Sequence, residues 1–551
     1  MNVTYLALGG RRVRAAAAHT ARLAADGSPV SLVTTARQEW NGVPIPPGVT
    51  LRRVGSPRAA RPLVEAAGTV YAGDPEALAV AYATGRPGVL LEPSPDPARR
   101  PQPADLAVVT PWYPAPDDPF AGAFVQAATA AVAPDFTRVS ILHTQSWFYP
   151  AGRLTGQLLG VAAERQALRS GNAVVMDTSE GELTRVAAPT PAGGDYLAYA
   201  DEQTRALRAA LPTGRIDAPV VHAHTGVMAG VVAARLARPD ARIVVTEHAT
   251  FLAQAFRQPG VLRRYADMLA RADALLCVGR HLYDELAAVF PEQAGKLHIV
   301  PNAIDFGRFA VRAEPPREPL RWLYLGRLMA HKGVLVLLDA FSRVAADDPR
   351  VTLTLVGGGP LEAALDRRIA DLQLSGRVTR RPPVSPEQVT ALLHEHDLLV
   401  HVSRRETFGM TVVEAVATGT PVLVARSSGP AETLDGIGDR AGAVFEPTDD
   451  PGIVVAAYRD LQARFSALDL DGARSELLAR YGTDAVRARL RQVYTAPGPP
   501  SSATVPEPVL PPIRRLTSRL PSPVPEALVR TGVRVMRRSS SLLRQPRRHW
   551  L

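Results

Sequence analysis

The stretch HDLLVHVSRRETFGMTVVEAVATGTPVLVA, residues 396–425, decides the fold of the second half of the chain. Its pattern predicts an apolar strand at 398–402, a polar turn, a helix at 410–418 and a second strand at 422–424. Gly419 is a typical stop after such a helix. A βαβ unit of this kind is the building block of a doubly wound parallel sheet.

Two glutamates mark this unit. Glu406 follows the carboxyl end of the first strand, where ligands bind in doubly wound sheets. Glu414 comes eight residues later, about 12 Å along a helix, which exceeds the separation of about 5 to 9.5 Å in glycoside hydrolases. The amides of Gly409, Met410 and Thr411 begin the helix and can hold an anion. The spacing leaves two interpretations open: contacts with one extended ligand, or two ordinary solvated glutamates.

The same stretch resembles the signature of a known enzyme family. Phe408-Gly409 between the glutamates, and the Gly419-Thr420-Pro421 turn after the helix, are similar to retaining GT-B glycosyltransferases of family 4, the glycosyl transferases group 1. The resemblance implies two facing Rossmann-like domains with a nucleoside-diphosphate-sugar donor, UDP or GDP based, between them. It also implies transfer of the sugar to an acceptor hydroxyl with retention of anomeric configuration, in polysaccharide, glycolipid or glycoconjugate biosynthesis.

A second motif supports the resemblance. Gly326, Arg327, Lys332 and Gly333 match the family's Gly-Arg-x4-Lys-Gly element after a predicted strand. A guanidinium fork and a compact ammonium near a helix start suit a diphosphate. The chain has 63 basic residues, of which only Lys296 and Lys332 are lysines. A lysine at position 332 in so arginine-rich a chain favours a specific role for its compact ammonium group.

The resemblance assigns roles to individual residues. It implies that Arg327 and Lys332 stabilise the leaving diphosphate without a metal ion or other cofactor. It also implies that Glu406 and His248 contact the sugar, and that Glu414 binds the ribose hydroxyls. The other donor-binding residues that it implies are Gly122, Gly326, Val384, Phe408, Gly409, Met410 and Thr411.

The first half of the chain carries weaker signals. The Pro-rich loop at 111–124, with Gly122, resembles the loop that faces the donor phosphates in this family. His248 ends the buried-looking strand IVVTEH, at the edge where a sugar contact is expected. His222 and His224 have a two-residue spacing on a strand and no third ligand in view, so no metal site is predicted.

Three places depart from the expected motifs. Gly9-Gly10 follow the first predicted strand but lack the full GxGxxG fingerprint, which favours a structural role over phosphate binding. Gly279 stands where the family has a helix-capping serine, so the cap is weaker. Ser428-Gly429 replaces a Gly-Gly pair.

Composition and patterning divide the chain into four parts. We expect an appended Rossmann-like segment at 1–100, which is alternatively a partial duplication of the segment that follows. An acceptor-side GT-B domain is expected at 101–302, and a donor-binding GT-B domain at 303–496. A Pro-rich linker and disordered basic tail are expected at 497–551. Within the second part, residues 144–200 are expected to be irregular with short helical patches.

The charge of the chain is concentrated at one end. Of the net charge of +10, residues 511–551 carry +9 through ten arginines and Glu526, so the body is nearly neutral and no nucleic-acid partner is predicted. The tail is either disordered or a contact for anionic lipid. No apolar run reaches membrane-spanning length and no signal pattern begins the chain, so we expect a cytoplasmic protein, peripheral on the inner membrane face if the tail binds lipid. The single Cys277 excludes an intrachain disulfide.

Two alternatives share the predicted fold. One is a sugar-nucleotide epimerase, and the other is a non-catalytic scaffold that binds a sugar nucleotide, because a fold does not fix a function. The intact set of Arg327, Lys332, Glu406 and Glu414 argues against the scaffold. Neither the donor base and sugar nor the acceptor is encoded in a pattern that can be read from the sequence.

Overall fold

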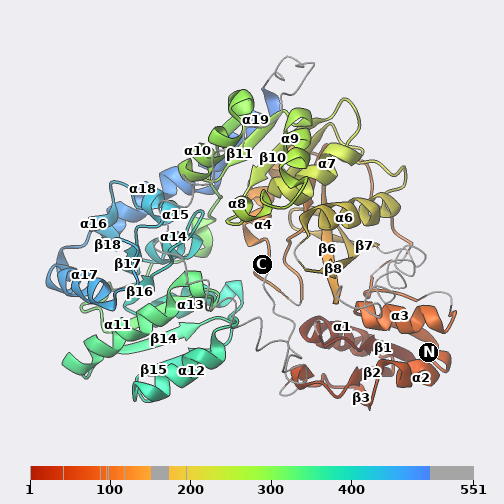
Figure 1. Ribbon diagram of the computed structural model, residues 1–551, viewed down its shortest axis with the longest axis horizontal. Helices are drawn as coiled ribbons and strands as arrows, with labels where there is room; N and C mark the ends of the chain where they lie inside the picture. Colours follow the sequence, from red (N-terminus) through yellow and green to blue (C-terminus); the bar gives the residue numbers. More distant parts are fainter. Residues whose placement is uncertain are drawn as a thin grey trace.

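Three α/β units follow one another along the chain (Figure 1). The computed structural model describes residues 2–10, 12–40, 43–86, 89–94, 96, 98–116, 118–150, 173–193 and 195–496. The predicted linker and tail at 497–551 lie outside these residues. The expectation of two Rossmann-like domains with an extra N-terminal α/β segment is confirmed. Within the described ranges, no helix is both long enough and apolar enough to cross a bilayer.

The appended unit is a parallel sheet of four strands in the order β3-β2-β1-β4. Its strands are β1 (Val3–Ala7), β2 (Val30–Thr35), β3 (Val49–Val54) and β4 (Thr69–Ala72). Its helices are α1 (Val13–Ala25), η1 (Gln38–Trp40), η2 (Pro57–Ala60), α2 (Arg61–Glu65) and α3 (Pro75–Ala83). Strands β1 and β2 are buried along their whole length, as expected for strands covered on both faces.

The first GT-B domain is built on an eight-stranded sheet in the order β12-β11-β10-β9-β5-β6-β8-β7, in which only β7 is antiparallel to its neighbour. Its strands are β5 (Leu106–Thr110), β6 (Val139–Pro150), β7 (Ala173–Thr178), β8 (Gly181–Ala192), β9 (Val220–His224), β10 (Arg242–Glu247), β11 (Ala274–Cys277) and β12 (Leu297–Ile299). Its helices are α4 (Ala123–Val132), η3 (Ala133–Asp135), α6 (Tyr196–Ala210), the π-helix η4 (Thr225–Gly230), α7 (Val231–Leu236), α8 (Leu252–Ala255), α9 (Val261–Arg271), α10 (Arg280–Val289) and η5 (Pro291–Lys296).

The expectation of an irregular region at 144–200 is wrong for its described part. Strand β6 continues to Pro150, and β8 pairs with it in parallel register from 140 to 150 against 182 to 192. Strand β8 reads GELTRVAAPTPA, which has neither the alternation nor the β-branched richness of a typical strand. It is buried over most of its length between other elements, so tertiary pairing overrides its weak local preference.

The second GT-B domain is built on a six-stranded parallel sheet in the order β15-β14-β13-β16-β17-β18. Its strands are β13 (Arg321–Leu325), β14 (Thr352–Val356), β15 (Val378–Arg381), β16 (Leu398–His401), β17 (Val422–Ala425) and β18 (Gly442–Phe445). The linking turn η6 (Phe306–Arg308) is followed by η7 (Ala330–Lys332), α11 (Val334–Asp347), α12 (Glu362–Asp371), η8 (Pro386–Gln388), α13 (Val389–His394), α14 (Met410–Ala417), α15 (Ser428–Thr433), α16 (Gly438–Ala441), α17 (Pro451–Ala463), η9 (Phe465–Ala467), α18 (Leu470–Tyr481) and α19 (Thr483–Thr495).

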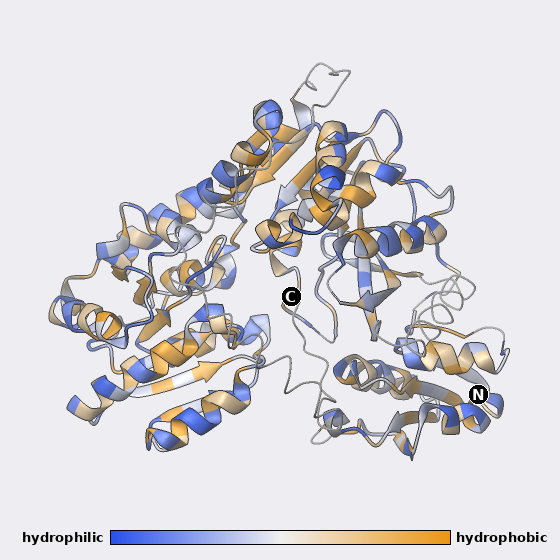
Figure 2. Ribbon diagram, in the orientation of Figure 1, coloured by the Kyte–Doolittle hydropathy of each residue, from blue (hydrophilic) through white to orange (hydrophobic). Residues whose placement is uncertain are grey.

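The predicted βαβ unit lies in the middle of this sheet. Residues 396–425 form β16, α14 and β17, and the two strands pair in parallel register. Figure 2 shows hydrophobic strands flanked by helices that carry both hydrophobic and hydrophilic residues. The apolar faces of these helices bury the sheet, and the polar faces meet solvent.

Helix α19 returns from the second GT-B domain to the first. It packs against α4, and Arg487 forms an ion pair of 2.5 Å with Asp135 at the end of the adjoining η3. The Tyr494 hydroxyl shares a hydrogen bond of 2.8 Å with His222 Nδ1 in the first domain. The last described helix therefore ties the two domains together.

Candidate functional site

An ion pair joins the two motifs that the sequence placed in separate loops. Strands β13 and β16 are neighbours in the six-stranded sheet, and the loops after their carboxyl ends carry Lys332 and Glu406. Lys332 Nζ donates a hydrogen bond of 2.6 Å to Glu406 Oε2, and the side chains are 21% and 18% exposed. A largely buried pair at this edge occupies the position where ligands bind in doubly wound sheets.

Gly333 makes this close approach possible. Its φ is +70°, and a Cβ there would lie 2.4 Å from the Val402 carbonyl oxygen, so a residue with a side chain does not fit. The backbone of Arg404 also donates to the His331 carbonyl at 3.0 Å, which joins the two loops. The loop that carries Lys332 is therefore fixed against the end of β16.

The environment of Glu406 keeps its carboxylate ionised. Burial raises the pKa of Glu406, but the charge of Lys332 and the neighbouring His401 outweigh burial and hold it well below the usual value. His401 Nε2 lies 3.7 Å from Glu406 Oε2 and is buried as the last residue of β16. The sequence reasoning missed His401, although its position at a strand end is the signal that identified His248.

Helix α14 begins directly beside this ion pair. Gly409 is the N-cap residue with φ +89°, and Met410 and Thr411 form the first helical positions. The preceding Phe408 is buried and packs edge-on against Tyr481 with ring centroids 5.1 Å apart. Amides in the first turn of a helix lack intrahelical acceptors and carry partial positive charge. Four of the residues predicted for donor binding, Phe408 to Thr411, thus lie together at one helix start.

Glu414 lies farther along α14 in a different electrostatic setting. Burial raises the pKa of Glu414 to about 7, and only the exposed Arg308 opposes that effect. Within the described part of the chain, its carboxylate has no hydrogen-bond or ion-pair partner. The two glutamates therefore differ: Glu406 is paired and ionised, whereas Glu414 is unpaired and titrates near neutral pH.

The remaining predicted residues of this domain surround the same edge. Gly326 and Arg327 form the turn after β13, and the Tyr324 hydroxyl donates to the Arg327 carbonyl at 2.8 Å. Arg327 is half-buried and lies within electrostatic range of His331. Val384 is half-buried and, like Met410, packs against the hydrophobic cluster that contains Phe408 and the inner face of α14.

His248 and Gly122 belong to the facing domain. His248 comes directly after β10, and its Nε2 shares a hydrogen bond of 3.0 Å with His224 Nδ1. Its ring lies 4.3 Å from that of Phe124, which is in the first turn of α4. Gly122 is the N-cap residue of α4 with φ +69°. Burial lowers the pKa of His248 to about 3, so the imidazole is neutral at physiological pH.

The two domains meet at Gly279, the position that lacks the expected serine cap. The Glu432 Oε2 atom accepts a hydrogen bond of 2.6 Å from the Arg280 amide at the start of α10. A Cβ on Gly279 would lie 2.8 Å from the same oxygen and 3.4 Å from the Thr407 carbonyl oxygen. A carboxylate from the second domain therefore caps a helix of the first, right beside the loop that carries Glu406. The sequence had no signal for this pairing.

Two weaker sequence features are accounted for by internal contacts. His222 shares one hydrogen bond with Tyr494 and another, of 2.7 Å, with Thr246 Oγ1, so both of its nitrogens are used. In the ranges that the structure describes, no group of three or more His, Cys, Asp or Glu side chains is arranged to hold a metal ion. The Gly9 amide donates to Asp74 Oδ2 at 2.8 Å, which supports the structural interpretation of Gly9-Gly10.

Comparison with known families agrees with this geometry. Residues 309–460 match the family model described as "Glycosyl transferases group 1", and residues 168–308 match "Glycosyltransferase Family 4". Among curated proteins, the chain is 29% identical over 346 residues to glycogen synthase of Mycobacterium tuberculosis, covering 58% of this chain and 81% of that protein. It is 31% identical over 236 residues to D-inositol 3-phosphate glycosyltransferase of Nocardia farcinica, covering 40% and 49%.

Solved structures share the fold. Sucrose-phosphate synthase from Thermosynechococcus elongatus superposes with a TM-score of 0.55 at 19% identity, covering 72% of this chain and 98% of that one. Anabaena Alr3699/HepE in complex with UDP superposes with a TM-score of 0.51 at 16% identity, covering 71% and 100%. Together, the two family models cover residues 168–460, and the fold agrees with both structures. The chain belongs to the group 1 glycosyltransferases of the GT-B fold.

Proposed function

We propose that this glycosyltransferase moves a sugar from a UDP- or GDP-sugar to an acceptor hydroxyl with retention of anomeric configuration, in polysaccharide, glycolipid or glycoconjugate biosynthesis. The observation that carries the proposal is the buried Lys332–Glu406 pair, which lies at the carboxyl ends of adjacent strands and beside the start of α14. An anionic, hydroxyl-rich ligand matches that combination of cation, carboxylate and helix N-terminus.

The proposed chemistry depends on stabilising the leaving group. Breaking the bond between the sugar C1 and the diphosphate oxygen leaves negative charge on the diphosphate. Lys332 and Arg327, together with the first amides of α14, would neutralise that charge. In this proposal these groups supply the electrostatic stabilisation, and no metal ion or other cofactor takes part.

The two glutamates would bind different parts of the donor. Glu406 is held ionised by Lys332, with which it pairs. It would accept hydrogen bonds from sugar hydroxyls, while Lys332 would face the phosphates. Glu414 is unpaired, and the ribose hydroxyls would provide the hydrogen-bond donors that it lacks. Val384 would lie next to the base, and Phe408 and Gly409 would adjoin the sugar and phosphate.

The facing domain would complete the site. His248 is neutral and its ring is held by the hydrogen bond to His224. In this proposal the ring would contact the sugar. The Glu432 cap on α10 holds the domain boundary next to the Glu406 loop. Closing the domains around the donor would exclude water that otherwise hydrolyses it.

The relatives favour a nucleotide-sugar donor. The Anabaena protein of the same fold has been crystallised with UDP, and also with UDP-glucose. We propose the same ligand class here, with the base, the sugar and the acceptor left to experiment. We also propose a cytoplasmic location, with the arginine-rich segment at 511–551 as a contact for anionic lipid on the inner membrane face.

A donor screen tests the proposal. The full-length protein is incubated with a panel of UDP- and GDP-sugars, and thermal stabilisation and release of nucleoside diphosphate are measured. We expect one donor to raise the melting temperature and to release nucleotide slowly through hydrolysis, and faster with an acceptor. NMR of the product anomer then tests retention. If no donor in the panel stabilises the protein or releases nucleotide, the transferase proposal is refuted. Conversion of the donor to an epimer without nucleotide release would favour the epimerase.

A further inference from the structure

We propose that the appended unit positions the loop between β5 and α4 in the first GT-B domain, through a buried relay of charged side chains from Glu92 to Arg185. The described part of the appended unit lies before the first residue that the family models match, so the family does not account for it. The proposal rests on the proposed function only in treating that loop as part of the active site.

The appended unit is docked through a shared hydrophobic core. Trp147 on β6 is 1% exposed and packs with Ala187 of β8 into the cluster of the appended unit, among the side chains of β4 and α3. These two residues lie on the ends of β6 and β8 that run past the shorter strand β5, toward the appended unit (Figure 1). A shared core of this kind fixes the two units against each other.

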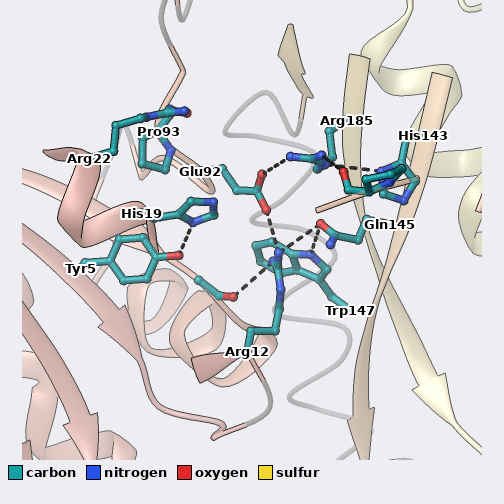
Figure 3. Close-up of polar contacts among 12 residues, drawn as sticks. Tyr5, Arg12, His19, Arg22, Glu92, Pro93, His143, Gln145, Trp147 and Arg185 are labelled. Atoms are coloured by element: carbon teal, nitrogen blue, oxygen red, sulfur yellow. Dashed lines mark hydrogen bonds and ion pairs between the residues drawn. The ribbon is translucent and has the colours of Figure 1, made fainter. Parts of the chain in front are cut away.

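A charged relay crosses the same boundary (Figure 3). Arg12 of the appended unit donates to Glu92 Oε1 at 2.8 Å and to Gln145 Oε1 of β6 at 3.1 Å, and its guanidinium carbon lies 4.4 Å from the centre of the Trp147 ring. On the other side, Arg185 Nη1 of β8 lies 3.8 Å from Glu92 Oε2. One carboxylate of the appended unit is therefore shared by two guanidinium groups, one from each unit.

The charges in this relay are buried and depend on each other. Arg12, Glu92 and Arg185 are 8%, 7% and 6% exposed. Burial raises the pKa of Glu92, but Arg12, with smaller effects from His19 and Arg185, outweighs it and lowers the pKa to about 2. Glu92 is thus ionised at all physiological pH values. Loss of its charge would remove the carboxylate that the two buried guanidinium groups share, which is costly for charges held away from water.

The relay ends on the loop of the candidate site. Arg185 Nη2 donates to the Pro114 carbonyl at 2.9 Å, and Arg185 Nε contacts His143 Nδ1 at 3.4 Å. Pro114 belongs to the Pro-rich loop at 111–124. A Cβ on Gly122 would lie 2.0 Å from the Trp112 carbonyl oxygen, so the loop folds back tightly on itself.

The far end of this loop reaches the predicted sugar contact. Phe124 lies two residues after Gly122, and its ring lies 4.3 Å from that of His248. Arg185 therefore stands between the appended unit and a loop that supports His248. A guanidinium suits this place because its rigid fork serves the carboxylate, the carbonyl and the imidazole at once, whereas an ammonium is a single point charge. Arg185 is a positioning residue, since it acts through Pro114.

Hydrogen exchange of the loop tests the proposal in the full-length protein. The matched variants are Arg185→Lys, which keeps the charge but not the fork, and Glu92→Gln, which removes the counter-ion. The control is Val64→Ala, a fully buried residue of α2 that weakens the core of the appended unit without touching the relay. Peptides spanning 111–123 contain amides that are hydrogen-bonded within the loop, such as those of Ala115 and Ala121.

We expect these amides to exchange about tenfold faster in Arg185→Lys and in Glu92→Gln, but not in Val64→Ala. Unchanged exchange of the loop in Arg185→Lys, with peptides of residues 2–86 still protected, would overturn the proposal. Equal acceleration in Val64→Ala would also overturn it, because docking alone would then position the loop. If Glu92→Gln does not fold, Arg185→Lys decides. Hydrogen exchange needs no donor, so its result is separate from failure of the donor screen.

Discussion

Two parallel sheets of this protein end in acidic residues, and the two edges behave differently. At the appended sheet, Asp74 accepts from the Gly9 amide and lies beside Glu76, both less than 10% exposed. At the six-stranded sheet, Glu406 faces Lys332 at 2.6 Å. At the first edge two carboxylates therefore lie side by side, whereas at the second edge a carboxylate pairs with a cation.

The same sheet topology therefore has a filled carboxyl edge at Asp74 and Glu76, and an open carboxyl edge at Lys332 and Glu406. Burial, and secondarily Glu76, raises the pKa of Asp74 to about 7, so that edge binds a proton rather than an anion. A Cβ on Gly9 would lie 2.4 Å from Glu76 Oε2, so the glycine loop packs directly against two acidic side chains, whose charge would repel a phosphate. Carboxyl edges of parallel sheets are therefore candidate sites only where the side chains leave a charge to be matched.

The largest expected effect comes from removing the cation at the open edge. Lys332→Ala should lower turnover by roughly 10³-fold, because the developing charge on the diphosphate loses its main counter-charge. The protein should still fold, as checked by circular dichroism, and steady-state release of nucleoside diphosphate measures the loss.

The chain supplies a matched control in its other lysine. Lys296 Nζ donates to the carbonyls of Leu269, Ala270 and Ala272 at the end of α9, at 2.9 to 3.1 Å, far from the ion pair in sequence and in a different domain. Lys296→Ala should cost about 1 kcal/mol of stability through the lost helix cap, with turnover retained. Equal activity in Lys332→Ala and wild type would refute the role given to Lys332.

The unpaired glutamate of the open edge should make nucleotide binding depend on pH. Burial raises the pKa of Glu414 to about 7. In the proposed site, ribose hydroxyls would donate to the carboxylate and so favour its ionised form. Below pH 7 a bound nucleotide must first displace the proton, so UDP affinity should rise as pH increases from 6 to 8, by at most about tenfold per pH unit.

Titration calorimetry at several pH values checks this prediction. Glu414→Gln cannot ionise, so its affinity should be lower at pH 8, and the rise between pH 6 and 8 should be smaller than in the wild type, limited to the part that comes from ionisation of the UDP phosphate itself. A wild-type affinity that falls as pH rises would contradict the assignment of Glu414 to the ribose.

A smaller effect is expected where the facing domain closes the open edge. Glu432→Ala removes the carboxylate that caps α10 in place of the missing serine, at a cost of about 1 kcal/mol. Turnover should fall a few-fold because the domain boundary beside Glu406 loosens. Thermal unfolding and small-angle scattering with and without UDP measure the two effects.

The double variant Gly279→Ser with Glu432→Ala sharpens this test. A serine side chain clashes with Glu432 in the wild type but fits once that carboxylate is gone, and it restores a local cap. We expect stability to recover while the closure between domains does not. Recovery of both would mean that Glu432 serves only as a cap.

The smallest effect is expected at the filled edge. Because the folded pKa of Asp74 is raised, its contribution to stability is present at acidic pH and is lost as pH rises from about 4 through about 7. Glu76→Gln removes the neighbouring charge, so it should stabilise the protein by about 1 kcal/mol at pH 8 and have little effect at pH 4. Chemical denaturation at both pH values measures this change. Altered donor affinity in this variant would contradict the distinction between the two edges, because the edge at Asp74 and Glu76 would then be part of a ligand site.

Much of the second GT-B domain could be predicted from its sequence. The periodicity of residues 396–425 predicts a βαβ unit, because strand and helix periods are local properties. Lys332 and Glu406 could be placed at strand ends for the same reason. Strand β8 of the first GT-B domain could not be predicted, because it is stabilised by pairing with β6 rather than by the strand preference of its own residues.

The sequence by itself determined the class of fold, the family and the residues available for charge. Only the tertiary structure decided which of those residues meet. The residues that meet are far apart in sequence. Lys332 and Glu406 are separated by 74 positions, Arg280 and Glu432 are separated by 152, and Arg12 and Glu92 are separated by 80. Such contacts have no period or motif, because they depend on how loops from different elements pack, and packing is a property of the whole chain.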